Sequence, residues 1–142
     1  MPRAEGSPSV VVYAGKIYAI GGRSGRSDFG DVFIYDPASN SWSNGPAIEP
    51  RGTAGAVVYA NAIHLFGGES QAKRICLNSV LRLDHKKELW EPLLPMPTPR
   101  NFARAVLFNN AVYVVGGNST TDSSHASAGS VVVERFSYEK GS

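Results

Sequence analysis

Polar and charged side chains gather in three segments that could recognise a partner by charge and hydrogen bonding. Each segment follows a Gly-Gly pair, and their members are Arg23, Arg26 and Asp28, then Gln71, Lys73 and Arg74, and finally Asn118, Asp122 and His125. Arginine can hold a carboxylate through two parallel N–H groups, whereas lysine acts as a point charge. We expect these segments to bind a partner protein or peptide, and the alternative is that they are ordinary solvated loops.

Two further arginines, Arg51 and Arg100, each follow a proline just before an apolar run. In this position a guanidinium group can either bind a partner or brace the surrounding loops through hydrogen bonds. Both roles are open, and we include the two residues among the candidate binding residues.

The sequence contains no recognisable catalytic or metal-binding pattern. His64, His85 and His125 do not share a metal-ligand spacing, and no serine lies in a Gly-x-Ser-x-Gly motif. Gly21-Gly22-Arg23-Ser24-Gly25 lacks the Gly-Lys-Ser/Thr ending of a phosphate-binding loop. We therefore expect no catalytic residue, no metal site and no cofactor, and we expect that the protein is not an enzyme. His64 lies in an apolar run and is expected to be packed in the core.

Composition and charge narrow the class of protein further. The chain has 142 residues, of which 42% are hydrophobic, and a net charge of +2 from scattered residues, which argues against nucleic acid as a partner. The single cysteine, Cys76, excludes an internal disulfide and fits a reducing, cytoplasmic location, and we expect its thiol to be buried and inert. The apolar runs are too short to cross a membrane, so we expect a soluble protein.

The elements that position the polar segments repeat three times. Gly-Gly pairs begin at residues 21, 67 and 116, and each ends a phrase made of an apolar run, a two-residue turn and a second apolar run, at 9–20, 55–66 and 104–115. Ala14-Gly15, Ala60-Asn61 and Asn109-Asn110 occupy the turns, and Gly and Asn tolerate the positive φ that such turns need. These phrases predict hairpins of strands a and b. Third strands, c, are predicted at 31–37, 79–85 and 131–137.

A tryptophan follows the third strand in the first two repeats, because Trp42 and Trp90 stand seven residues after Tyr35 and Leu83. This pattern resembles the kelch repeat, in which each repeat forms one four-stranded propeller blade. The resemblance implies an all-β, kelch-type β-propeller fold in one partial domain, residues 1–142. We expect blades at about 3–48, 49–96 and 97–142. The third is expected to be incomplete, and Phe136 takes the place of the tyrosine there. The segments Met96-Pro97-Thr98-Pro99-Arg100, Glu49-Pro50-Arg51 and Met1-Pro2-Arg3 resemble the linker that precedes strand a.

The resemblance also implies a function. In kelch domains the b–c loops and the d–a loops line a partner-binding face, so we expect a protein–protein interaction module. Three blades cannot close a ring, and the two outer faces must be covered. We weigh three sources of cover: further blades of a longer protein, a different chain, or a second copy in a homodimer that completes a six-bladed ring. The resemblance leaves open a carbohydrate-active enzyme of the mutarotase type, whereas the copper ligands of the oxidase type are not reproduced.

Overall fold

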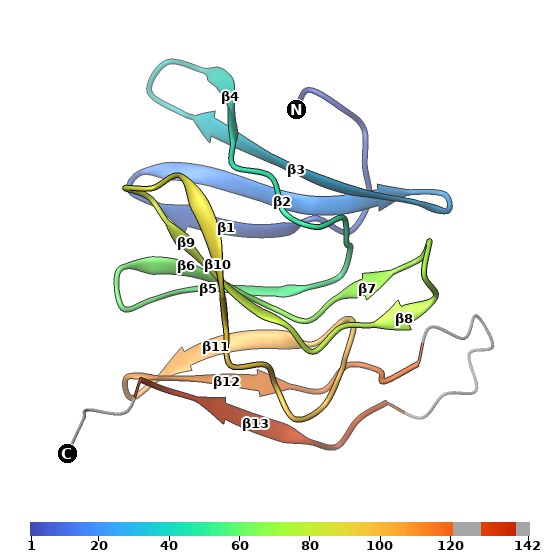
Figure 1. Cartoon of the computed structure of the whole chain (residues 1–142). Coiled ribbons are helices and arrows are strands. Elements are labelled where there is room, and N and C mark those ends of the chain that lie inside the picture. Colours follow the sequence, from blue (N-terminus) through green and yellow to red (C-terminus); the bar gives the residue numbers. More distant parts are fainter. Residues whose placement is uncertain (121–128, 139–142) are drawn as a thin grey trace.

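The fold consists of antiparallel β-strands in the computed structural model of the chain, which describes residues 1–120 and 129–138. No described residue lies in an α-helix. The strands form two sheets of four strands and one sheet of three, together with a small two-stranded hairpin (Figure 1). The predicted all-β fold with an incomplete last blade is confirmed. The sheets are referred to below as blades 1, 2 and 3.

The strands of each blade follow one another in sequence and in space. Blade 1 contains β1 (Ser9–Tyr13), β2 (Lys16–Ser24), β3 (Ser27–Asp36) and β4 (Ser41–Gly45). Blade 2 contains β5 (Gly55–Tyr59), β6 (Ala62–Phe66), β9 (Val80–Asp84) and β10 (Leu89–Leu93), and the hairpin β7 (Glu69–Ser70) and β8 (Ile75–Cys76) lies in its b–c loop. Blade 3 contains β11 (Arg104–Phe108), β12 (Ala111–Val115) and β13 (Val133–Phe136).

The hairpins of strands a and b form where the turn residues predict them. Asn109 and Asn110 in blade 3 both have positive φ, at 46° and 59°, and the corresponding residues of the other two blades do as well. Two consecutive positive φ values match the right-handed twist of the flanking strands. The turn chemistry thereby sets the register of each hairpin, and with it the face to which every apolar side chain points.

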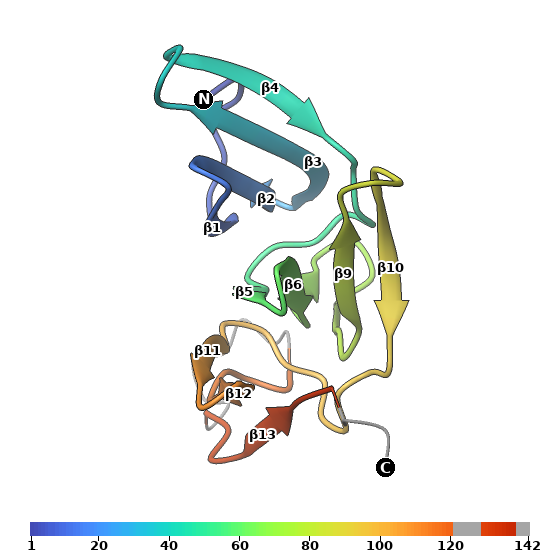
Figure 2. The same ribbon diagram turned by 90° about the vertical axis from the view of Figure 1, so that its left-hand side faces the viewer.

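The three blades stack face to face in an arc, with β1, β5 and β11 on the inner side and β4 and β10 on the outer side (Figure 2). One core cluster lies between blades 1 and 2 and includes Ile20, Val32 and Leu65. A second lies between blades 2 and 3 and includes Phe66 and Val112. Both faces of blade 2 are covered, which is why its strands are almost continuously apolar.

The Gly-Gly pairs lie where successive blades join. The amide of Gly22 donates to the carbonyl of Arg51 at 2.8 Å, and the amide of Gly68 donates to the carbonyl of Arg100 at 2.9 Å. A Cβ at Gly21 would lie 2.5 Å from the carbonyl oxygen of Arg51, a distance that no real side chain tolerates. The glycines therefore permit the linker of the next blade to approach the backbone of strand b.

The two tryptophans hold equivalent positions in different surroundings. Trp42 pairs with Tyr35 across β3 and β4, and Trp90 pairs with Leu83 across β9 and β10. Trp90 packs on the core between blades 1 and 2 and donates its indole N–H to the carbonyl of Pro46 at 2.7 Å. Trp42 is 37% exposed because it lies on the face of blade 1 turned away from blade 2. Trp90 therefore lies between blades 1 and 2, whereas Trp42 lies on an exposed face of blade 1.

The outer faces of blades 1 and 3 expose apolar side chains that the inner faces bury. Val12 on blade 1 is 66% exposed, and Phe108 on blade 3 is 61% exposed. In blade 2 the residue in register with Phe108 is Tyr59, which is buried against blade 3 and donates its hydroxyl to the carbonyl of Asn110 at 2.8 Å. The exposed faces of blades 1 and 3 thus carry apolar residues at positions that are buried where two blades meet.

Candidate functional site

The b–c loops project from one end of the blades, where the β2–β3 connection and the β7–β8 hairpin lie on the same side (Figure 1). Three of the basic residues predicted to bind a partner, Arg26, Lys73 and Arg74, are exposed at this end. Because the strands are antiparallel, all b–c connections lie at the same end of the stacked sheets. Two separate sequence segments therefore contribute to one surface. We refer to this end of the molecule as the b–c face.

A buried carboxylate, Glu69, joins all three blades beneath the b–c face. Its side chain is 3% exposed and accepts a hydrogen bond from the guanidinium group of Arg23 in blade 1. It accepts another from the side-chain amide of Asn101, which lies in the linker to blade 3. The side-chain amide of Gln71 also donates a hydrogen bond to the Glu69 carboxylate, at 2.9 Å. A buried carboxylate is stable only when it is paired and hydrogen-bonded. Arg23, predicted to bind a partner, therefore also holds blades 1 and 2 together, and Gln71, predicted to bind as well, supports the same carboxylate from within blade 2.

Asp28 ties the b–c loop of blade 1 to that of blade 2. Its Oδ2 accepts a hydrogen bond from the backbone amide of Ala72 at 3.1 Å and one from the hydroxyl of Ser70 at 3.3 Å. The carboxylate caps the turn of the neighbouring hairpin, as Asp side chains commonly do for free backbone amides. This contact fixes the position of the two loops relative to each other, so Arg26 and Arg74 are presented on a braced scaffold.

Lys73 forms an ion pair with Glu49 in the linker that enters blade 2. The side chains are 60% and 56% exposed, so solvent and salt screen their attraction. The hydrogen bond from Lys73 nevertheless lowers the pKa of the Glu49 carboxyl below its ordinary value. Because an exposed pair of this kind contributes little to stability, the Lys73 ammonium can exchange Glu49 for an acidic group of a partner.

Arg51 and Arg100 are buried, and of the two roles left open for them the structure favours bracing. Arg51 donates to the hydroxyl of Ser79 at 2.7 Å and to the carbonyl of Gly67 at 3.2 Å. Arg100 donates to the carbonyl of Val132 at 2.9 Å and is 0% exposed. Each guanidinium group bonds to its own blade, so neither reaches the surface of the b–c face. Burial lowers the pKa of Arg51 below its ordinary value.

Arg3 performs the same bracing in blade 1 from a different position. The backbone bridges align Gly6, Gly52 and Asn101, so the residue in register with Arg51 and Arg100 is Glu5. Arg3, two residues upstream, donates to Glu5 at 2.9 Å and to Asp31 at 2.7 Å. Met1-Pro2-Arg3 was expected to resemble the other two linkers. Arg3 makes comparable bracing contacts, but it does not occupy the position that corresponds to Arg51 and Arg100.

The third b–c loop is only partly described. Asn118 pairs through its backbone with Asn101, with N–O distances of 2.9 and 3.0 Å, and its carbonyl accepts the thiol of Cys76 at 3.6 Å. Burial raises the pKa of that thiol above its ordinary value. Asp122 and His125, both predicted to bind a partner, lie outside the described residues, so their positions on the b–c face stay predictions.

The structure adds an aromatic residue that the sequence analysis missed. Phe102 is 45% exposed, and the guanidinium carbon of Arg23 lies 5.6 Å from the centre of its ring, a cation–π arrangement. Its φ is 53°, and Ser7 and Thr53, in register with it, are at 55° and 60°. The joint imposes this backbone, yet a bulky residue is strained there. The Pro-Arg-Asn-Phe run after a linker proline was the signal that could have revealed it.

The remaining candidates for chemistry are accounted for by packing. His64 is fully buried, with its ring nitrogens 3.0 Å from the carbonyl of Ala62 and 2.6 Å from the hydroxyl of Tyr138, as expected for a core histidine. Within the described ranges, no three His, Cys, Asp or Glu side chains are grouped so that they could hold a metal ion. No described helix is long and apolar enough to span a bilayer.

Comparisons with known proteins agree with this architecture. A family model described as the KLHDC2/KLHL20/DRC7 Kelch-repeats domain matches residues 1–117. Kelch-like protein 23 of Homo sapiens is 30% identical over 98 residues, which cover 68% of this chain and 17% of that protein. Kelch-like protein 36 of Rattus norvegicus is 30% identical over 84 residues, which cover 58% of this chain and 14% of that protein.

The chain therefore spans less than a fifth of the length of these curated relatives. The family model nevertheless matches most of the chain, and its repeats correspond to sheets that stack as propeller blades. On these grounds, the chain belongs to the kelch-repeat family.

Proposed function

We propose that the chain is a protein-interaction module whose b–c face binds an acidic segment of a partner protein. The observation that carries this proposal is the placement of three exposed cationic side chains, Arg26, Lys73 and Arg74, on two loops that Asp28 ties together. The kelch-repeat family itself supports an interaction module in general. The choice of loops and the acidic chemistry of the partner are the specific parts of the proposal.

The charge distribution favours an anionic partner over a cationic one. The carboxylate of Glu69 is buried and already bonded to Arg23 and Asn101, while Asp28 is engaged by backbone. The acidic groups beneath the face are thus used for support, whereas the cationic groups are at the surface. Phe102 adds an exposed apolar surface beside Arg23, and interface anchors are often aromatic residues and arginine.

The proposal can be tested with a fluorescein-labelled peptide that carries two Asp and two Glu residues between apolar residues. Its matched probe is the same peptide with Asn and Gln in place of Asp and Glu. We expect the acidic peptide to bind at least about tenfold more tightly, with an affinity that falls as salt is raised. Equal affinity for the two peptides would contradict the proposal that the partner segment is acidic.

Variants locate the site. Arg26→Glu should weaken the acidic peptide by about tenfold, because it replaces attraction by repulsion at the b–c face. Lys86→Glu is the matched control, since it makes the same change in net charge in the turn between β9 and β10, at the opposite end of blade 2. If both variants weaken the peptide equally, the effect is one of overall charge and the b–c face is not the site.

A second candidate function, self-association, rests on the exposed outer faces. Gly22 and Gly68 donate to the linker of the following blade, and among the described residues Gly117 has no such partner. We propose that blade 1 of a second copy covers blade 3, so that two chains form a six-bladed ring in which the Gly117 amide meets the partner copy's linker carbonyl. Light scattering should then give about twice the 15.2 kDa of one chain. Phe108→Asp should restore the monomer, and a wild-type monomer would reject the dimer.

Both candidate functions are binding without turnover, and we propose that the chain is not an enzyme. A cytoplasmic location, expected from the single cysteine, is part of the same proposal. The absence of enzyme activity can be checked by incubating the protein with free sugars of the class that mutarotases act on and measuring the rate at which their anomers exchange. A rate of anomer exchange above that of a boiled sample would contradict this part of the proposal.

A further inference from the structure

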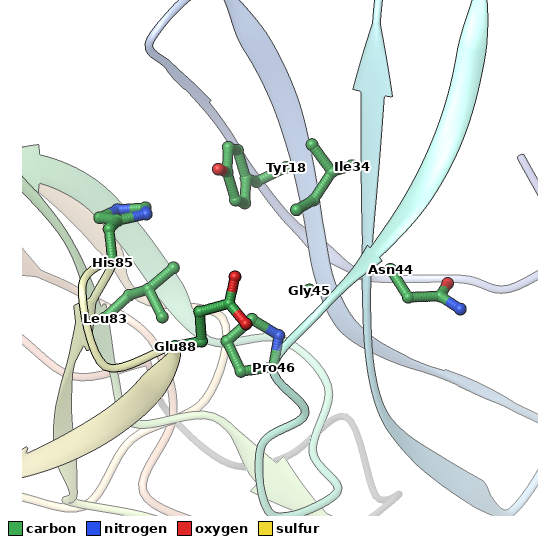
Figure 3. Close-up of a pocket in the computed structure, with 8 residues that line it drawn as sticks. All are labelled: Tyr18, Ile34, Asn44, Gly45, Pro46, Leu83, His85 and Glu88. Atoms are coloured by element: carbon green, nitrogen blue, oxygen red, sulfur yellow. The ribbon is translucent and has the colours of Figure 1, made fainter.

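A second candidate site lies at the opposite end of the blades from the b–c face. A cavity of about 160 Å³ opens between blades 1 and 2 (Figure 3). Tyr18 and Ile34 line it from strands b and c of blade 1, and Pro46 lines it from the linker that follows β4. His85 and Glu88 come from the turn between β9 and β10 of blade 2. The cavity therefore exists only because the two blades are stacked.

Three polar groups converge on this cavity without a bonding partner among the described residues. The Nε2 atom of His85 is buried and has no hydrogen bond. Among the described residues, neither the Glu88 carboxylate nor the Tyr18 hydroxyl has a hydrogen-bond or ion-pair partner. Figure 3 shows the Glu88 carboxylate and the Tyr18 hydroxyl on the cavity side. Buried polar groups in proteins are nearly always paired, so the unpaired Nε2 of His85 calls for a ligand. The Tyr18 hydroxyl and the solvent-exposed Glu88 carboxylate line the same cavity and can bind that ligand too.

Each of the three groups can accept a hydrogen bond. The ring of His85 is fixed by stacking on Tyr13, with 4.1 Å between ring centres and 3° between planes. Burial lowers the pKa of His85, which favours the neutral imidazole, and one of its two nitrogens then carries a free lone pair. Burial also raises the pKa of Tyr18, so its phenol keeps its proton and can accept a hydrogen bond through its oxygen. Glu88 contributes a carboxylate.

An ammonium group matches this set, because it has three N–H donors and no acceptor. The chain's own Lys87 does not fill the role, since its ammonium bonds to Glu91 at 3.0 Å and pairs with Asp84 at 3.6 Å. Ile34, Leu83 and Pro46 supply apolar walls that can contact a methylene chain. Such walls suit the stem of a lysine side chain, which commonly packs its methylenes on apolar surface.

We propose that this cavity binds the side chain of a lysine on a partner protein, with its ammonium held by Glu88, His85 and Tyr18. The site is independent of the b–c face and of the acidic partner proposed for it. It would let a kelch blade pair contact a second partner, or a second segment of one partner, from the other end of the molecule. Acetylation of that lysine would abolish recognition, because it removes the charge and two of the donors.

The test is a titration of the ¹³C-labelled protein with acetyl-Gly-Lys-Gly-amide, followed through the His85 ring signals by NMR. The matched probe is the same peptide with acetyl-lysine. We expect saturable shifts of the His85 signals with the lysine peptide and at least about tenfold weaker binding of the acetylated one. Equal binding of the two peptides would overturn the proposal.

Two variants assign the contacts. Glu88→Gln should weaken the lysine peptide by about tenfold, while Glu49→Gln, an exposed carboxylate on the other end, should leave it unchanged. Tyr18→Phe should weaken it by a smaller factor, since one neutral acceptor is lost. Unchanged binding by Glu88→Gln would remove the site. Butylammonium carries the same ammonium group and methylene chain, so it should shift the same His85 signals, and its failure to do so would show that the cavity does not recognise a lysine side chain.

Discussion

Arg23 of blade 1 donates a hydrogen bond to the carboxylate of Glu69, which is buried in blade 2, 46 residues away along the chain. Both residues directly follow a Gly-Gly pair, so they occupy the same position in successive repeats. Blade stacking brings equivalent positions together and converts a one-dimensional repeat into a contact between opposite charges. The ion pair therefore joins blades 1 and 2 directly beneath the b–c face.

Glu69→Ala should destabilise the protein by about 2 to 4 kcal/mol, because it leaves Arg23 and Asn101 without their shared acceptor. The measurement is the urea midpoint followed by tryptophan fluorescence. Glu49→Ala, which removes an exposed carboxylate, should change stability by no more than about 0.5 kcal/mol. Similar midpoints for the two variants would show that Glu69 does not join the blades.

Trp90→Ala should lower stability by about 3 kcal/mol, since it removes a ring packed between blades 1 and 2 and the hydrogen bond to Pro46. Trp42→Ala removes the same side chain from an exposed face and should cost about 1 kcal/mol or less. Circular dichroism during thermal unfolding separates the two. A loss below about 1 kcal/mol for Trp90→Ala would remove its inter-blade role.

Gly21→Ala and Gly116→Ala test the joint between blades. The new Cβ at Gly21 would meet the Arg51 carbonyl at 2.5 Å, whereas at Gly116 nothing lies within 4 Å. Both residues have positive φ, at 62° and 71°, so both variants carry backbone strain of about 1 kcal/mol. Only Gly21→Ala should lose further stability from the clash. Equal urea midpoints for the two variants would mean that the close approach is not essential.

His64 should make stability depend on pH. Burial is the main cause that lowers its pKa in the folded protein, and the nearby Arg82 acts in the same direction. The unfolded chain therefore binds a proton more readily than the folded one, so stability is present above the ordinary value of about 6.5 and falls as pH drops below it. Urea midpoints at about pH 7.5 and pH 5 should differ more in the wild type than in His64→Gln. An equal pH dependence in both would exclude His64 as the source.

Phe102→Gly should separate binding from stability. Glycine relieves the strain of a φ of 53°, so the free energy of unfolding should stay within about 1 kcal/mol of the wild type. The acidic peptide should bind more weakly, because the exposed ring beside Arg23 is lost. Fluorescence anisotropy measures the binding and urea unfolding the stability. Unchanged peptide affinity would remove Phe102 from the binding face.

Much of the fold could be predicted from sequence because its signals are local. Asn109-Asn110 and the two equivalent turns impose positive φ on neighbouring residues, and that requirement depends on no distant contact. The Gly-Gly pairs could be recognised from the repeat, although the close approach that requires them is a contact with the linker of the next blade, as between Gly21 and Arg51. Nearly continuous apolar runs are typical of strands covered on both faces, and blade 2 is covered on both faces by its two neighbours.

The candidate site was less predictable, because side-chain exposure is decided by what a neighbouring blade covers. Arg26 and Arg100 are the same residue type, yet one is exposed and the other is fully buried. Sequence by itself determined the strands, the turns and the repeat that stacks them. Only the tertiary structure decided which charges became braces and which remained at the surface, and where Phe102, Glu69 and the His85 cavity lie, because those contacts join residues far apart along the chain.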